Sequence, residues 1–137
     1  MTSDGFVDAP PRVLIVMHEQ WPRALIRAAL REVGYDAIGT QALTSALKIP
    51  PIAPDRGPVR LVIVDQPVLT GARDDERLAA LLARHEHPAT ILIARPTVSV
   101  PKDHWTRVLS RPVSVEEVVG AAQEILPLAL TVRRSVD

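Results

Sequence analysis

The sequence predicts an α/β protein with a doubly wound parallel sheet. Short, continuous apolar runs such as Leu61–Val64 are typical of strands that are buried on both faces of a parallel sheet. Between these runs apolar residues recur at helical spacing, so strands and helices alternate along the chain. Right-handed crossovers would then place helices on both faces of the sheet. The 137 residues are enough for one ordinary domain, and 47% of them are hydrophobic.

The element boundaries follow from capping residues and from proline and glycine. Pro22 suits the first turn of a helix, and Gly34 can take the left-handed conformation that ends one. Asp74 is expected to cap a helix, and Ser114 with Glu117 forms the capping-box pattern S-x-x-E. Strands are expected at 13–16, 35–39, 61–64, 90–94 and 108–109, and helices at 22–33, 41–48, 75–84 and 115–126.

Composition excludes several classes of function. Sixteen basic and sixteen acidic residues cancel, which gives no overall attraction to nucleic acid or to an anionic membrane. The chain has no cysteine and no apolar run of membrane-spanning length, which predicts a cytoplasmic protein without disulfides. We expect a flexible lead at 1–11, one domain at 12–127 and a tail at 128–137.

Candidate functional residues gather where the strands end. In a doubly wound sheet, ligands bind outside the carboxyl ends of the strands, which here bring together 17–20, 65–69, Arg95 and Arg111. Asp65 directly follows the clearest buried strand. A carboxylate at that place is costly unless it is used or paired.

Taken in order, these residues resemble the receiver domain of response regulators over about residues 12–126. That family's phosphoacceptor aspartate ends the third strand, as Asp65 does here, and Gly71 closes the following loop. The family's lysine and cis-proline after the fifth strand correspond to Arg111 and Pro112. The resemblance implies a flavodoxin-like sheet with strand order 2-1-3-4-5 and a signalling protein that is not an enzyme.

The sequence departs from that family at the other site positions. The family's first strand usually ends V-D-D-E-P, whereas Met17, His18 and Glu19 stand in this acidic pocket. The fourth strand ends in Ala94, where the family has a serine or threonine hydroxyl. Because Mg²⁺ prefers oxygen ligands, we expect poor magnesium binding and no metal or other cofactor. Ala94 also cannot donate a hydrogen bond to a phosphoryl group.

These substitutions predict a standing ion pair between Asp65 and Arg111. An arginine can bind a carboxylate through two parallel hydrogen bonds, whereas lysine acts as a point charge. His18 is a candidate second partner, which would complete a cluster without metal. The alternative is that His18 is an ordinary loop residue exposed to solvent and that Asp65 is a relic satisfied by Arg111.

The segment between the last two strands predicts a truncated fourth helix. Residues 95–107 contain Pro96 and Pro101, so a single turn or a loop is expected where receivers have a full helix. The aromatic residue that receivers carry before the lysine is replaced by Val108. Either another face binds partners, or Trp105 supplies a replacement anchor. Trp21 and Trp105 are equally compatible with covering the edge of the core.

Three functions fit this pattern. The first is a stand-alone pseudo-receiver that signals through protein contacts without magnesium-dependent phosphorylation, its partner being a histidine kinase, an output protein or a second copy. The second is a single-domain response regulator that is phosphorylated on Asp65 in a two-component phosphorelay and binds Mg²⁺ weakly. The third is a small-molecule binder or enzyme that uses the same crevice.

Overall fold

The computed structural model describes residues 9–96 and 104–128 and contains the predicted parallel sheet. Five strands lie in the order β2-β1-β3-β4-β5, which confirms the predicted topology. The strands are β1 (Arg12–Val16), β2 (Asp36–Thr40), β3 (Val59–Asp65), β4 (Ala89–Ala94) and β5 (Arg107–Ser110). The helices in the described residues are α2 (Gln20–Glu32), α3 (Leu43–Ala46), α4 (Asp74–Arg84) and α5 (Val115–Ile125), with a short 3-10 helix η1 (Gln66–Leu69).

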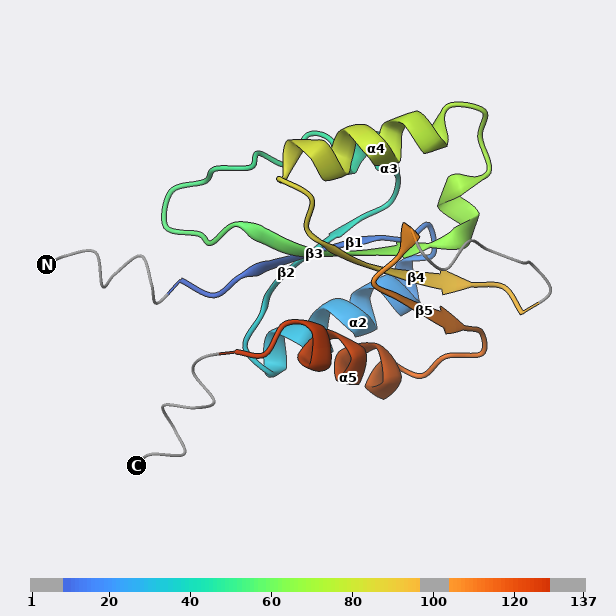
Figure 1. The fold of residues 1–137 in the computed structure, drawn as a ribbon. Coiled ribbons are helices and arrows are strands. Elements are labelled where there is room, and N and C mark those ends of the chain that lie inside the picture. The colour runs from blue at the N-terminus through green and yellow to red at the C-terminus, as the bar shows by residue number, and fades with distance from the viewer. Residues whose placement is uncertain (1–8, 97–103, 129–137) are drawn as a thin grey trace, which may run out of the picture.

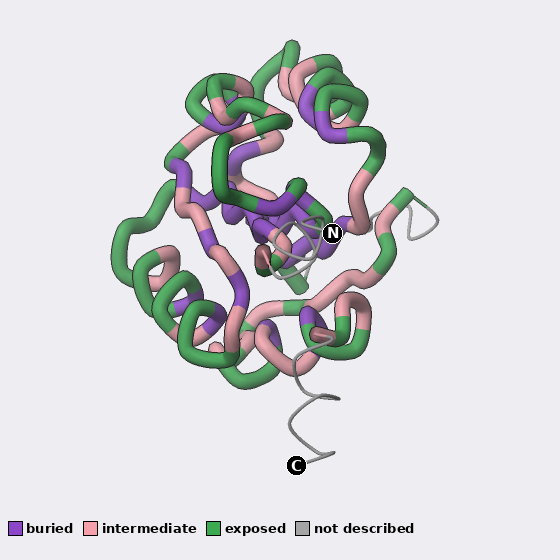
Figure 2. Tube along the Cα trace, turned by 90° about the vertical axis from the view of Figure 1, so that its left-hand side faces the viewer, coloured by how far each residue is buried: buried purple, intermediate pink, exposed green. Residues whose placement is uncertain are grey.

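The helices form two layers around the sheet. In Figure 1, α3 and α4 cover one face while α2 and α5 cover the other. Figure 2 looks along the strands from the side where they begin, and its buried residues concentrate in the central sheet. The apolar side chains accordingly form two clusters, one under each helical layer. This arrangement explains why β1 and β3 carry no polar alternation, because both of their faces are covered.

Alternation along the strands divides the core between the two faces. Val13, Ile15 and Met17 point toward α2 and α5, and Leu14 and Val16 point toward α3 and α4. The parallel register pairs Val16, the last residue of β1, with Val64 of β3, so β3 extends one residue further, to Asp65. The carboxyl-terminal edge of the sheet, where the candidate functional residues are expected, is therefore formed by strands whose side chains are nearly all buried.

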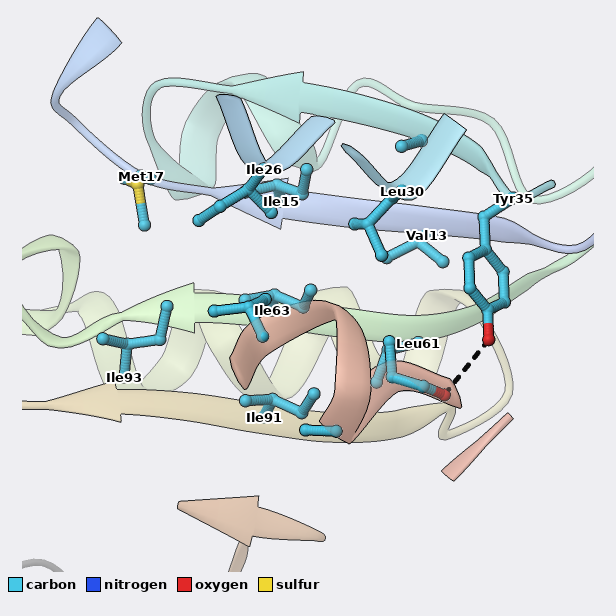
Figure 3. Close-up of a cluster of buried hydrophobic side chains, with 14 residues drawn as sticks. Val13, Ile15, Met17, Ile26, Leu30, Tyr35, Leu61, Ile63, Ile91 and Ile93 are labelled. Carbon is cyan, nitrogen blue, oxygen red and sulfur yellow. Dashed lines mark hydrogen bonds between the residues drawn. The ribbon is translucent and has the colours of Figure 1, made fainter. Parts of the chain in front are cut away.

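Tyr35 connects the start of β2 to the end of α5. Its hydroxyl donates to the carbonyl oxygen of Leu126 at 2.6 Å and lies 3.3 Å from that of Ala122, which is the contact dashed in Figure 3. Gly34, just before it, has a φ of 112°, the left-handed conformation that the sequence predicts for this position. Burial raises the pKa of the Tyr35 hydroxyl. The C-terminal helix is thus joined to the opposite edge of the sheet by side-chain hydrogen bonding.

The helix starts confirm one sequence prediction and correct another. The capping box is present, because Ser114 accepts from the Glu117 backbone N–H while the Glu117 carboxylate accepts from that of Ser114. The prediction that Asp74 caps α4 is wrong, since Asp74 is the first helical residue and follows Arg73. The Asp74 carboxylate instead reaches back to the Gly71 N–H at 2.6 Å. It therefore closes the preceding turn.

Some sequence predictions concern segments outside the described residues. These are most of the lead at 1–11, nearly all of the tail at 128–137, and the middle of the segment between β4 and β5, including Pro101. The described part of that segment, residues 95–96 and 104–106, contains no α-helix. In the part of the chain that the structure describes, no helix has the length and apolar character needed to cross a membrane.

Candidate functional site

Asp65 is the buried carboxylate at the centre of the candidate site. It is the last residue of β3 and is 1% exposed. The β3–β4 register pairs it with Ile93, so Ala94 lies one residue beyond it at the same edge. Met17 follows the end of β1, and Arg111 follows the end of β5. The sheet therefore brings together the four strand ends that the sequence predicts to meet.

Arg111 forms an ion pair with Asp65, as the sequence predicts. Its Nη2 atom donates to Oδ2 of Asp65 at 2.7 Å. The carboxylate side chain is 2% exposed and the arginine side chain 33%, so the charge of Asp65 is desolvated and that of Arg111 is partly hydrated. The Arg111 backbone N–H donates to the Ala94 carbonyl at 2.9 Å, and the peptide bond from Arg111 to Pro112 is cis.

One hydrogen bond joins the Arg111 and Asp65 side chains. A two-pronged grip is one way for arginine to hold a carboxylate, but here only Oδ2 accepts from the guanidinium. The second oxygen, Oδ1, is buried and has no hydrogen-bond partner among the described residues. An unpaired buried carboxylate oxygen costs free energy, so this atom is where the site can still accept a donor.

Of the three acidic-pocket positions, only Glu19 carries a carboxylate, and it is exposed. Met17 is 1% exposed and belongs to the apolar cluster, where Figure 3 shows it at the end of β1. His18 and Glu19 are exposed, and in the described structure neither forms an ion pair with a charged side chain. The predicted participation of His18 as a second partner of Asp65 is therefore absent, because its side chain faces solvent.

The residues present do not fit a magnesium site of the kind that the receiver resemblance implies. Among the described residues, no group of three histidine, aspartate or glutamate side chains is placed to hold a metal ion. The buried thioether of Met17 is a soft ligand, whereas Mg²⁺ requires oxygen ligands in octahedral geometry. Ala94 is buried and offers only a methyl group at the hydroxyl position.

Two residues that hold the site together were not assigned a role from the sequence. Arg23 on α2 donates through Nη1 to the carbonyl oxygens of Met17 at 2.8 Å and His18 at 3.1 Å. Gln66 accepts through Oε1 from the backbone N–H of Arg95 at 2.7 Å, which links the ends of β3 and β4. The available signal was position, since Gln66 directly follows Asp65 and Arg23 lies in the first turns of the first helix. Arg23 binds backbone carbonyls and Gln66 binds a backbone N–H, and no sequence pattern indicates which backbone group a side chain will contact.

The two tryptophans lie in different environments. Trp105 is half-buried and packs against the cluster under α3 and α4. It lines a hollow of about 630 Å³ together with Leu78, Leu82 and Leu92, beside the edge strand that carries the half-buried Val108. Trp21 is 74% exposed, and Leu25, one turn further along α2, is 55% exposed. Covering the core edge is thus a role of Trp105, whereas Trp21 is available at the surface.

The fold is that of response regulator receiver domains. A response regulator receiver protein from Burkholderia phymatum aligns with a TM-score of 0.67 at 19% identity, over 87% of this chain and 97% of that chain. A receiver domain protein from Clostridium thermocellum aligns with a TM-score of 0.63 at 16% identity, over 93% and 99% of the two chains. Both likenesses confirm the flavodoxin-like arrangement that the resemblance to receiver domains implies.

A third solved structure has the same fold under another name. An adenylate cyclase from Rhodopirellula baltica aligns with a TM-score of 0.65 at 12% identity, over 93% of this chain and 97% of that chain. The sequence matches no protein-family model and no curated protein. At these identities the comparisons show the fold, and the function must be argued from the site.

Proposed function

We propose that this chain is a receiver-like signalling domain that acts through protein contacts, with Asp65 held by Arg111 instead of being phosphorylated with magnesium. The observation that carries the proposal is the 2.7 Å ion pair between these residues, in a site where Met17 and His18 stand in place of the family's acidic pair and where the described residues form no metal-binding group. We further propose that the protein works in the cytoplasm, without a cofactor and without catalysis. Its partner would be a histidine kinase, an output protein or a second copy of the chain.

The ion pair supports a fixed state of the site. A carboxylate that is 2% exposed is retained only with a compensating charge, so Asp65 keeps Arg111 at the end of β5. Arg111 in turn is fastened by its backbone N–H to Ala94. The ends of β3, β4 and β5 are thereby joined without any phosphoryl group. Such a domain presents one surface to its partner constitutively.

An apolar surface lies next to this pair. The exposed Leu25 of α2 lines a hollow of about 300 Å³ whose wall includes Arg111, Val113 and Val115. Trp21 is exposed one turn before Leu25 on the same helix. Large aromatic and aliphatic side chains beside an arginine are typical of residues that dominate protein interfaces. We therefore propose that this α2 surface, comprising Trp21, Leu25 and the adjoining hollow, is the contact face.

A second function is favoured by one specific observation. Oδ1 of Asp65 has no partner among the described residues, so one carboxylate oxygen remains available as an acceptor or nucleophile. A single-domain response regulator that is phosphorylated on Asp65 by a histidine kinase would use this atom. It would also require Arg111 to release Oδ2 and a cation to be held by residues such as Glu19.

Binding of beryllofluoride, a mimic of an acyl phosphate, separates the two functions. Calorimetry and the fluorescence of Trp21 and Trp105 would be followed with wild type and Asp65→Asn at millimolar Mg²⁺. The proposed function predicts no saturable binding by either protein. Saturable, magnesium-dependent binding by wild type alone would overturn it and establish the phosphoacceptor.

A matched variant tests whether the absent carboxylate and hydroxyl groups are the reason for the lack of beryllofluoride binding. His18→Asp with Ala94→Thr restores one carboxylate and the hydroxyl at positions near Asp65, and His18 is exposed, so the first change buries no new charge. Beryllofluoride binding gained by this variant would support the assignment of these positions. Sedimentation of wild type and of the double variant Trp21→Ser, Leu25→Ser would show whether a second copy of the chain occupies the α2 surface. A wild-type dimer that becomes a monomer in the variant would place the dimer contact on that surface.

A further inference from the structure

A second candidate site lies at the opposite edge of the sheet from Asp65, where the strands begin. The loop after α4, the Pro-rich loop before β3 and the starts of β3 and β4 surround a hollow of about 640 Å³. Figure 2 looks onto this edge. The volume is within the usual range for pockets that hold small organic ligands. The side chains that matter to the argument are Ile52, Pro58, Arg60, Arg84, His85 and Leu126.

The lining carries a local excess of positive charge. Arg60 and Arg84 both line the hollow, and neither forms an ion pair with a carboxylate of residues 9–96 or 104–128. Arg84 donates only its Nε to the Ile49 carbonyl, at 3.1 Å, so its two terminal nitrogens are uncommitted in the described structure. Glu86 is the one carboxylate among the lining residues. Each guanidinium group offers the positive charge and the paired N–H donors that bind an oxyanion.

The floor of this region contains buried polar groups without partners. His85 lines the hollow, is 6% exposed, and has no hydrogen-bond partner for either ring nitrogen among the described residues. Arg12, whose charge acts on His85, is fully buried; its Nε and Nη2 donate to the carbonyls of Gly57 and Pro51, and its Nη1 is unpaired in the described structure. Each such group destabilises the folded protein unless a hydrogen-bond partner satisfies it.

The charges around His85 favour an anion in this hollow. Burial, followed by the charges of Arg12 and Arg84, lowers the pKa of its imidazole. The same cations that oppose protonation of His85 would attract an anion. A bound anion would offset their effect and supply an acceptor for a histidine N–H.

We propose that this hollow binds a small organic phosphate, with Arg60 and Arg84 on the phosphate, His85 as a hydrogen-bond donor, and the organic part against Ile52, Pro58 and Leu126. A phosphate is favoured over a carboxylate because two guanidinium groups and a titratable imidazole can compensate a dianion. The inference is independent of the function proposed for Asp65, since the two sites lie at opposite ends of the strands.

Nuclear magnetic resonance titration and calorimetry with the full chain test the proposal. Adenosine monophosphate, inorganic phosphate and citrate would be added at constant ionic strength, while the His85 ring signals and the Glu86 and His87 amides are followed. We expect saturable binding of adenosine monophosphate and weaker binding of inorganic phosphate. Arg60→Ala and Arg84→Ala should each weaken binding by about tenfold or more, a loss of roughly 1.4 kcal/mol. Arg27→Ala, which removes an exposed arginine of α2, should leave the affinity unchanged.

Each other outcome contradicts the proposal. No saturable shift with any of the three probes would overturn the site, as would equal affinities for wild type and the Arg60 and Arg84 variants. Binding of citrate without binding of either phosphate would overturn the assigned ligand class. Because Arg60 and Arg84 are exposed, their variants should fold, and the test does not depend on replacing the buried His85.

Discussion

The guanidinium of Arg111 neutralises only one oxygen of Asp65: Nη2 lies 2.7 Å from Oδ2, while Oδ1 is buried without a partner among the described residues. The two residues come from the ends of β3 and β5, with β4 between them. Removing Arg111 and removing Asp65 should therefore have different effects on stability. Loss of the cation leaves a buried charge, whereas loss of the carboxylate leaves an arginine that can turn to water.

Arg111→Ala should lower the free energy of unfolding by about 2 kcal/mol, because Asp65 then stays buried without compensation. This is less than the usual cost of breaking a fully buried pair because the arginine side chain is 33% exposed and water can enter. Urea unfolding of the two proteins measures the difference. Adding Asp65→Asn to Arg111→Ala should recover more than half of the loss, since the amide carries no charge. A double variant as unstable as Arg111→Ala alone would contradict this explanation.

Tyr35→Phe should cost about 1–2 kcal/mol, because it removes the donor to the Leu126 carbonyl while keeping the ring in the core. The hydroxyl contact is 2.6 Å long and the residue is 3% exposed, so water cannot readily replace it. Denaturant unfolding gives the value. Ser45→Ala, which removes an exposed hydroxyl from α3, is the control and should change stability much less. Equal effects of both changes would show that the Tyr35 hydrogen bond is not important.

The strands and the meeting of the strand ends could be predicted from the sequence because they depend on burial. Leu61–Asp65 is an apolar run ending in a carboxylate, and only a doubly covered strand explains such a run. Once the sheet is parallel, the ends of β3 and β5 must lie at one edge, which brings Arg111 near Asp65. The capping box at Ser114 depends on residues three apart and was equally predictable.

The contacts that the sequence did not predict are made to backbone atoms or depend on distant loops. Arg23 bonds carbonyls of the β1–α2 connection, and Asp74 bonds an N–H before its helix instead of within it. Arg12 is wholly buried although arginine is usually exposed, because the carbonyls of Pro51 and Gly57 surround it. The Arg12 contacts exist only after the Pro-rich loop has folded over the start of β1, and no periodicity in the sequence encodes that.

Ser114→Ala should destabilise the protein by about 1 kcal/mol through loss of the cap of α5. The hydroxyl accepts from the Glu117 N–H at 3.1 Å, and alanine would leave that donor at the helix start without its side-chain partner. Thermal and urea unfolding measure the loss. Ser114→Asp retains an acceptor at the N-terminus of the helix and should stay close to wild type. If aspartate proves as harmful as alanine, the hydroxyl acts through something other than capping.

The stability of the protein should fall as the pH drops below about 6.5, the pKa of an unperturbed histidine, because of His85. Burial, Arg12 and Arg84 lower the pKa of His85 in the folded state, so in this range the unfolded chain binds a proton that the folded chain does not. The free energy of unfolding therefore decreases by up to about 1.4 kcal/mol per pH unit until the folded pKa is reached.

Urea unfolding of wild type and His85→Gln between neutral and mildly acidic pH checks this, with the exposed His87→Gln as control. The pKa of Asp36 is lowered by its hydrogen bond to Arg56, which affects stability only in more acidic solution, so it does not confuse the comparison. A wild-type slope that persists in His85→Gln would assign the effect to another group.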